Sequence, residues 1–133
     1  KVLLDGNFIH ATLACGMKDL QKHVPNLLGG RAKLFVTPCI MAELRKLGKE
    51  FRDSAIAARS IPLHYCGHGV PGDDGSASLA AADCLKEQVG DSNPQRWWVA
   101  TQDRALRTAL ANVPGAPLLF ASLNGLHLEQ PSE

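Results

Sequence analysis

The residues best suited to chemistry in this sequence are four acids, two of which follow apolar runs. Asp5 ends the run "KVLLD", and Asp103 follows the run "RWWVAT". Ligands of open parallel sheets bind beyond the carboxyl ends of the strands, so we expect these two acids at one crevice. Glu43 in "CIMAEL" and Asp83 in "AADCL" lie on predicted helices that should border it. Four carboxylates together would bind Mg²⁺ or Mn²⁺, and two such ions could activate water to hydrolyse a phosphodiester.

The same acids also have a plain structural interpretation. Glu43 and Asp83 can be surface residues of their helices, and Asp103 can simply cap the helix that follows it. A phosphatase-like hydrolase with Asp5 as nucleophile fits poorly, because Asn7 stands where a second aspartate is usual. A bare protein-interaction module would leave the four acids unexplained. The residues alone therefore leave a metal site and a structural role open.

A second group of reactive side chains lies in "PLHYCGHGVPGDDG", residues 62 to 75, where Cys66 and His68 stand one residue apart. Thiolate and imidazole groups at this spacing can bind one zinc ion. The long distances along the chain to Cys39 and Cys84 fit no standard zinc finger, so the pattern alone leaves zinc and an ordinary loop open. Cys15 is expected to be a small, buried or half-buried hydrophobic residue.

Strands that alternate with helices must position these side chains. Apolar runs predict strands at 1–5, 32–37, 96–101 and 116–121, with a short last strand at 125–129. The helices predicted between them cover 7–14, 17–28, 38–48, 49–60, 76–90 and 103–112. Pro25 should end or kink the second helix, and Ser76 or Ser78 should cap the fifth. This order predicts an α/β fold with a parallel sheet and helices on both faces.

Composition sets broad limits on the function. The chain has 133 residues, 45% apolar and 20% charged, with a net charge of +1, which predicts one globular domain over residues 1–133. An apolar run of about 20 residues is missing, so no membrane partner is expected. Four widely spaced cysteines without a secretory signal favour reduced thiols or metal ligands. The chain begins within an apolar run, so we expect a domain of a longer protein.

Basic residues are the candidates for contacts with RNA phosphates. They crowd the segment from residue 45 to 59 and follow Asp103: Arg45, Lys46, Lys49, Arg52, Arg104 and Arg107. A solvated helix face explains the same pattern. Trp97 and Trp98 are adjacent on a strand and are both expected in the core. Because the net charge is near zero, weak RNA affinity is predicted for this domain alone.

Several longer stretches identify a family. "VLLDGNF", "TPCIMAELRKLGK", "YCGH", "AADCL" and "VATQDRALRTALANVPGAPLLF" occur in this order and spacing. In them the chain resembles, over nearly its whole length, the PIN-domain rRNA-processing factors of the small-subunit processome. "DGNF" and "ATQD" look more like the Utp23 branch of that family than like its sibling, the Fcf1 branch.

The resemblance implies two metal sites in a PIN domain with a central, parallel, twisted sheet and helices on both faces. The acids of such nuclease-like folds bind Mg²⁺ or Mn²⁺ and cut single-stranded RNA; the matching residues are Asp5, Glu43, Asp83 and Asp103. This branch also carries a structural zinc held by three cysteines and one histidine; the matching residues are Cys39, Cys66, His68 and Cys84. Such a closed site positions helices and has no open position for chemistry.

The resemblance also implies a function. Members of this branch are RNA-binding assembly factors for pre-rRNA processing and 18S rRNA maturation in the nucleus and nucleolus. Their partners are pre-rRNA, an H/ACA small nucleolar RNA and proteins of the small-subunit processome, and the domain is expected to be monomeric. Some members have lost acids, so the alternative of an active Mg²⁺- or Mn²⁺-dependent, single-strand endoribonuclease stays open.

Overall fold

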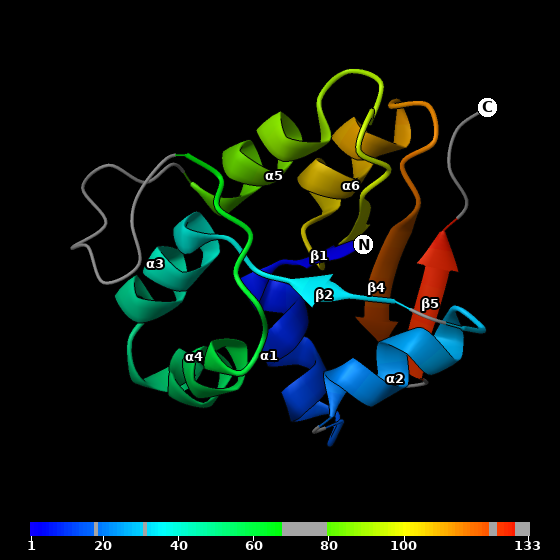
Figure 1. Ribbon diagram of the computed structural model, residues 1–133. Coiled ribbons are helices and arrows are strands. Elements are labelled where there is room, and N and C mark those ends of the chain that lie inside the picture. The colour runs from blue at the N-terminus through cyan, green and yellow to red at the C-terminus, as the bar shows by residue number, and fades with distance from the viewer. Residues whose placement is uncertain (18, 31, 68–79, 123–124, 130–133) are drawn as a thin grey trace.

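A single five-stranded sheet forms the centre of the molecule (Figure 1). The computed structural model describes residues 1–17, 19–30, 32–67, 80–122 and 125–129. The strand order is β2-β1-β3-β4-β5. The strands are β1 (Val2–Leu4), β2 (Leu34–Phe35), β3 (Trp98–Ala100), β4 (Leu118–Ser122) and β5 (Gly125–Glu129). All three residues of β1 are fully buried, as expected for the central strand of a sheet covered on both faces.

The sheet is mostly parallel. Val2 of β1 pairs in parallel with Leu34 of β2 on one side and with Trp98 of β3 on the other, and β3 pairs in parallel with β4. The last strand departs from the predicted parallel sheet, because β5 runs antiparallel to β4. Its pairing begins at Ser122 and Gly125, and so short a connection leaves no room for the crossover that a parallel pair requires.

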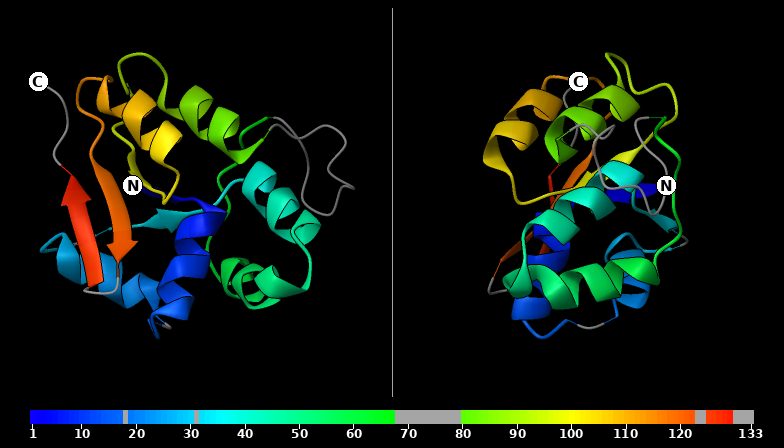
Figure 2. Two further views of the ribbon diagram at one scale, coloured as in Figure 1. Left: turned by 180° about the vertical axis from the view of Figure 1, so that it is seen from behind. Right: turned by 90° about the vertical axis from the view of Figure 1, so that its left-hand side faces the viewer.

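Helices cover both faces of the sheet, as predicted. The helices are α1 (Gly6–Ala14), α2 (Leu20–Leu27), α3 (Pro38–Lys46), α4 (Arg52–Arg59), α5 (Ala81–Val89) and α6 (Arg104–Ala111), with a 3-10 turn η1 (Lys49–Phe51). Helices α5 and α6 lie on one side of the sheet and α1 and α2 on the other (Figure 1). Helices α3 and α4 lie beside the end of β1 (Figure 2). None of the helices in the described ranges has the length and apolarity needed to cross a bilayer.

Side-chain caps fix where three of these helices begin. Asp5 caps α1 by accepting from Gly6 N, Thr37 caps α3 by accepting from Ile40 N, and Asp103 caps α6 by accepting from Leu106 N. Helix α5 differs from its prediction: it begins after Ala80, which forms no side-chain cap. The predicted caps Ser76 and Ser78 lie outside the described residues.

Three other local predictions have different outcomes. Cys15 is exposed and donates a weak hydrogen bond to Ser122 O (3.6 Å), so the prediction that it is buried was wrong. Pro25 lies inside α2, which ends two residues later. Trp97 is fully buried in the core, whereas Trp98 is partly exposed and packs against the core from its edge. Their different burial agrees with side chains on opposite faces of a strand.

Candidate functional site

The strand order changes direction at β1, and this places the acids. From β1 the chain continues to β2 on one side of the sheet, and later to β3 on the other. A crevice opens beyond the carboxyl ends of two strands at such a switch point. Asp5 directly follows β1, and Asp103 begins α6 shortly after β3. The two acids therefore lie at the edge of the sheet where an α/β protein binds its ligands.

A pocket of about 210 Å³ occupies this crevice. Three acids line it: Asp5, Glu43 and Asp103. It is smaller than the roughly 300–1,000 Å³ of sites for drug-sized ligands. Its size and its oxygen ligands suit a hydrated divalent cation with a phosphate group better than a large organic cofactor.

Asp83, the fourth predicted acid, does not line this pocket. It is exposed on α5. The start of α5 contributes Ala80, Ala81 and Ala82 to the pocket lining instead. The structure thus brings together three of the four predicted acids, and the metal-binding role of Asp83 stays a prediction from the sequence resemblance.

Asp5 is the most strongly perturbed acid of the pocket. Only 3% of the residue is exposed. The pKa of Asp5 is raised from 3.8 to about 6, chiefly by burial and to a smaller extent by the negative charges of Glu43 and Asp103. Hydrogen bonds from Thr101 and from Gly6 N oppose the shift. A cation in the pocket would favour the charged form of Asp5, as expected for a metal-binding carboxylate.

A hydrogen-bond network holds the acids in place. The Thr101 hydroxyl lies 2.7 Å from Asp5 Oδ2 and 3.3 Å from Asn7 Oδ1, so its proton can be donated to either oxygen. The same hydroxyl oxygen accepts from Asp103 N at 3.1 Å. Gln102 N donates to Asn7 Oδ1 at 3.0 Å. Thr101 is fully buried, so Asp5 and the backbone of Asp103 have a fixed separation.

Three helices begin at this pocket. Asp5 and Asp103 cap α1 and α6, and the first turn of α5 lines the pocket without a side-chain cap. The N-terminal end of a helix carries a partial positive charge. These ends partly offset the repulsion among the acids and would favour the phosphate of a bound nucleic acid.

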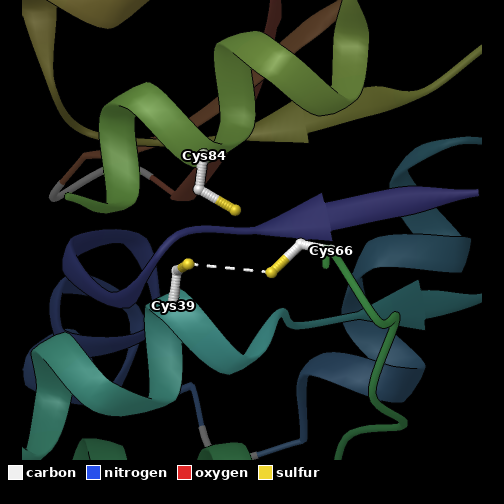
Figure 3. A group of neighbouring side chains, drawn as sticks. All are labelled: Cys39, Cys66 and Cys84. Carbon is white, nitrogen blue, oxygen red and sulfur yellow. Dashed lines mark hydrogen bonds between the residues drawn. The ribbon is translucent and has the colours of Figure 1, made fainter. Parts of the chain in front are cut away.

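Three cysteines meet close to this site (Figure 3). Cys39 comes from α3, Cys84 from α5, and Cys66 from the segment between α4 and α5. Their sulfur atoms all lie within 4.8 Å of one another, and Cys39 Sγ is 3.6 Å from Cys66 Sγ. Two thiolates on one tetrahedral zinc, with Zn–S bonds of about 2.3 Å, stand about 3.8 Å apart. The distance between the sulfurs of Cys39 and Cys66 therefore matches that of two ligands on one zinc ion, and Cys84 Sγ lies within 4.8 Å of both.

The electrostatics of the cysteines also suit a cation. Burial raises the pKa of the Cys84 thiol, and the neighbouring Cys39 and Cys66 add to the rise, while a hydrogen bond with Thr37 opposes it. A cysteine thiol binds zinc only after it has lost its proton. A bound cation would therefore offset the cost of charging these buried groups. His68, the fourth predicted ligand, lies outside the described residues.

His64 fixes the position of the segment that carries Cys66. Its backbone N donates to Val36 O at 2.8 Å, and its Nε2 lies 3.1 Å from Gln88 Oε1. Gln88 Nε2 in turn donates to Cys66 O at 3.4 Å. These contacts join the Cys66 segment to Val36, just after β2, and to α5, and they agree with the absence of His64 from the three-cysteine cluster.

The predicted RNA-binding residues differ in their exposure. Five are exposed: Arg45, Lys46, Lys49, Arg52 and Arg104. Arg107 is partly buried, with its guanidinium group 4.5 Å from the centre of the Phe120 ring. Its Nε is buried without a hydrogen-bond partner in the described residues. Arg107 therefore has a packing role, whereas the other five can reach a solvent-borne phosphate.

Sequence reasoning missed the apolar side of the pocket. Leu47 and Phe51 line it together with the acids. Both belong to the segment that the sequence marked only as basic. Their alternation with cations between residues 45 and 52 was the available signal.

Comparison with known proteins gives the family. The model of the Fcf1 family matches residues 26–130. The chain is 29% identical to the rRNA-processing protein utp23 of Schizosaccharomyces pombe over 99% of its own length and 49% of that protein. It is 31% identical to the rRNA-processing protein FCF1 of Saccharomyces cerevisiae over 90% of its length and 58% of that protein. The chain thus spans about half to three fifths of these relatives.

A solved structure supports the same assignment. The PIN domain endonuclease Utp24 matches with a TM-score of 0.83 and 27% identity, over 99% of this chain and 92% of that one. The family match and the shared fold confirm the resemblance to PIN-domain rRNA-processing factors. This chain belongs to the Fcf1 family, and its fold is that of a PIN domain.

Proposed function

We propose that this domain belongs to a pre-rRNA processing factor and binds single-stranded RNA at the edge of its sheet. The observation that carries the proposal is the pocket where Asp5, Glu43 and Asp103 converge beside an exposed cationic segment. Relatives named as rRNA-processing proteins in two yeasts support the RNA class. Within that class we propose 18S rRNA maturation, with pre-rRNA, an H/ACA small nucleolar RNA and processome proteins as partners, in the nucleus and nucleolus.

The three acids would hold Mg²⁺ or Mn²⁺, and the three cysteines would hold zinc with His68 as the fourth ligand. A divalent ion at the acids would supply a Lewis acid that neutralises a bound phosphate. Thr101 keeps Asp5 oriented toward this pocket, and Asp103 is fixed by its bond to Leu106 N. The zinc would have no part in the chemistry and would tie α3 to α5.

A second candidate function is metal-dependent cleavage of single-stranded RNA. The buried Asp5 beside two further acids favours it, and the structurally similar Utp24 is called an endonuclease. The exposure of Asp83 weakens it, because the pocket then offers one carboxylate fewer for a second metal ion. We therefore give RNA binding precedence over catalysis.

Rescue of 18S rRNA production separates the two functions. Cells depleted of the full-length protein would receive either the charge reversals Lys46→Glu, Lys49→Glu and Arg52→Glu, or Asp103→Asn. If the domain docks RNA, the charge reversals should abolish rescue, whereas Asp103→Asn should keep most of it. If it is an enzyme, Asp103→Asn should fail with normal protein levels and normal RNA binding, and the precursor should accumulate uncut.

A further inference from the structure

The acidic pocket has an apolar wall that metal binding does not use. Leu44, Leu47 and Phe51 line the same 210 Å³ cavity as the three acids. A hydrated cation or a phosphate gains nothing from contact with such a surface, because these groups are stabilised by polar partners. The wall therefore suits a different part of the ligand.

Leu47 is unusual for its exposure. It is the C-cap residue of α3 and is 48% exposed. Exposing this side chain leaves apolar area in water that a ligand could cover at a gain of about 25 cal/mol per Å². Ile56 on α4 is equally exposed at 50%, but it does not line the pocket.

Phe51 is held rigidly in the wall. Its ring stacks on the His10 ring, with centroids 4.2 Å apart and an interplanar angle of 28°. His10 Nδ1 lies 3.3 Å from the hydroxyl of the buried Ser54. A side chain that is already ordered loses little conformational entropy when a ligand packs against it.

Exposed cations lie next to the wall residues along the chain. Lys46, Lys49 and Arg52 are exposed and alternate along the chain with Leu47 and Phe51. Proteins that bind single strands combine cations for the phosphates with apolar or aromatic surfaces on which bases stack. The segment from Lys46 to Arg52 presents both between the last residue of α3 and the first residue of α4, across the 3-10 turn η1.

We propose that Leu47 and Phe51, over the buried Leu44, form a subsite for one nucleobase of single-stranded RNA, beside the phosphate held at the acids. This deepens the proposed function and rests on it. Every base offers an apolar face, so the subsite should tolerate any sequence. A base in a duplex is stacked on its neighbours, so the subsite should select unpaired RNA.

The test is a binding cycle with two strands and two matched variants. Fluorescence anisotropy would measure the binding of labelled oligouridine, and of the same strand with abasic sugars throughout, to the 133-residue chain with Mn²⁺ present. Leu47→Ser should weaken binding of oligouridine by roughly fivefold or more, in the range of one base stack. It should change binding of the abasic strand less than twofold. Ile56→Ser, the control of equal exposure, should change neither.

Three outcomes would overturn the subsite. In the first, Leu47→Ser weakens binding of oligouridine and of the abasic strand by the same factor. In the second, Ile56→Ser weakens oligouridine binding as much as Leu47→Ser does. In the third, the unchanged protein binds both strands with equal affinity. In each of these the RNA still binds, so the proposed function survives. If the unchanged chain binds neither strand even at low salt, both proposals fail. Phe51→Leu provides a second variant that keeps apolar volume and removes only the ring; it should weaken oligouridine selectively.

Discussion

Two properties of Asp5, its hydrogen bonding and its burial, have opposite effects on its charge. As the cap of α1 and a partner of Thr101 it accepts hydrogen bonds, yet its burial penalises the charge that makes it a good acceptor. Because its pKa in the folded protein is about 6, above the ordinary 3.8, the folded state binds more protons than the unfolded state between these values. Without a metal ion, the folded protein therefore loses stability as pH rises from about 4 to 6.

Replacing Asp5 with Asn should stabilise the metal-free protein at neutral pH. The gain should approach about 3 kcal/mol, which corresponds to a shift of two pKa units. It should shrink toward zero as pH falls from 7.5 to about 3, because only below the unfolded pKa of 3.8 is Asp5 protonated in both states. Thermal unfolding of both proteins across this pH range measures the difference. A constant difference at all pH values would mean that Asp5 does not titrate as described.

The acids should also respond to metal. Mn²⁺ that binds only the folded state stabilises it by about 2.7 kcal/mol at one hundred times its dissociation constant. The double change Asp5→Asn and Asp103→Asn should abolish the rise in melting temperature. Asp83→Asn should keep the full rise, because Asp83 does not line the pocket. If Mn²⁺ no longer raised the melting temperature of Asp83→Asn but still raised that of the double variant, Asp83 would be a metal ligand after all.

At the scale of the elements, Cys39 and Cys84 lie on α3 and α5, two helices that also line the pocket. Cys39 precedes Glu43 by about one turn of α3, and Cys84 follows the part of α5 that lines the pocket. A metal ion bound by both helices would therefore set the width of the acidic pocket. A metal ion at the cysteines would thus link the two clusters mechanically.

Elemental analysis tests this link. We expect one zinc per chain in the unchanged protein and in Cys15→Ser, whose thiol is exposed and far along the chain from the other three. Cys66→Ser should lose zinc and should lower the melting temperature by roughly 10 °C or more, because structural zinc contributes directly to folding. It should also weaken the Mn²⁺ response of the intact acids. Zinc-free protein from a chelator-free preparation, with no change in stability, would contradict the site.

For the whole molecule, the net charge of +1 hides a local excess of cations. RNA binding releases counterions in proportion to the phosphates that are neutralised, at about 0.7 log units of affinity per log unit of salt for each contact on a single strand. Changing Lys46, Lys49 and Arg52 to Gln should therefore reduce the salt slope by about 2. Titrations between 50 and 200 mM salt, a range suited to such slopes, measure it. Changing the exposed Lys22, outside the segment, should leave the slope intact.

Much of this fold follows from local patterns in the sequence. The apolar runs predict all five strands, and the ends of β1 and β3 place Asp5 and Asp103 correctly, because parallel strands share one carboxyl edge. The antiparallel course of β5 depends on the shortness of one connection, which a strand pattern does not express. Cys15 was expected to be buried or half-buried but is exposed, because burial depends on packing between elements, not on residue type.

The helix acids show a further limit of sequence reasoning. Successive residues on an α-helix point about 100° apart, so a shift of one position decides whether a side chain faces a pocket. Ala82 lines the pocket and its neighbour Asp83 does not, although both stand in "AADCL". The motif locates the helix, but only the rotation of α5 against the sheet determines which residue faces the site.

The central position of β1 determines when the site can exist. This strand is the first of the domain's strands along the chain, yet its neighbour β3 lies near residue 100. A ribosome releases the chain from its N-terminus, so β1 remains without this partner until most of the domain has emerged. Pairings between such distant segments also form slowly. A nascent or truncated chain that ends before α6 therefore has no assembled pocket, and it cannot engage RNA there before the domain is complete.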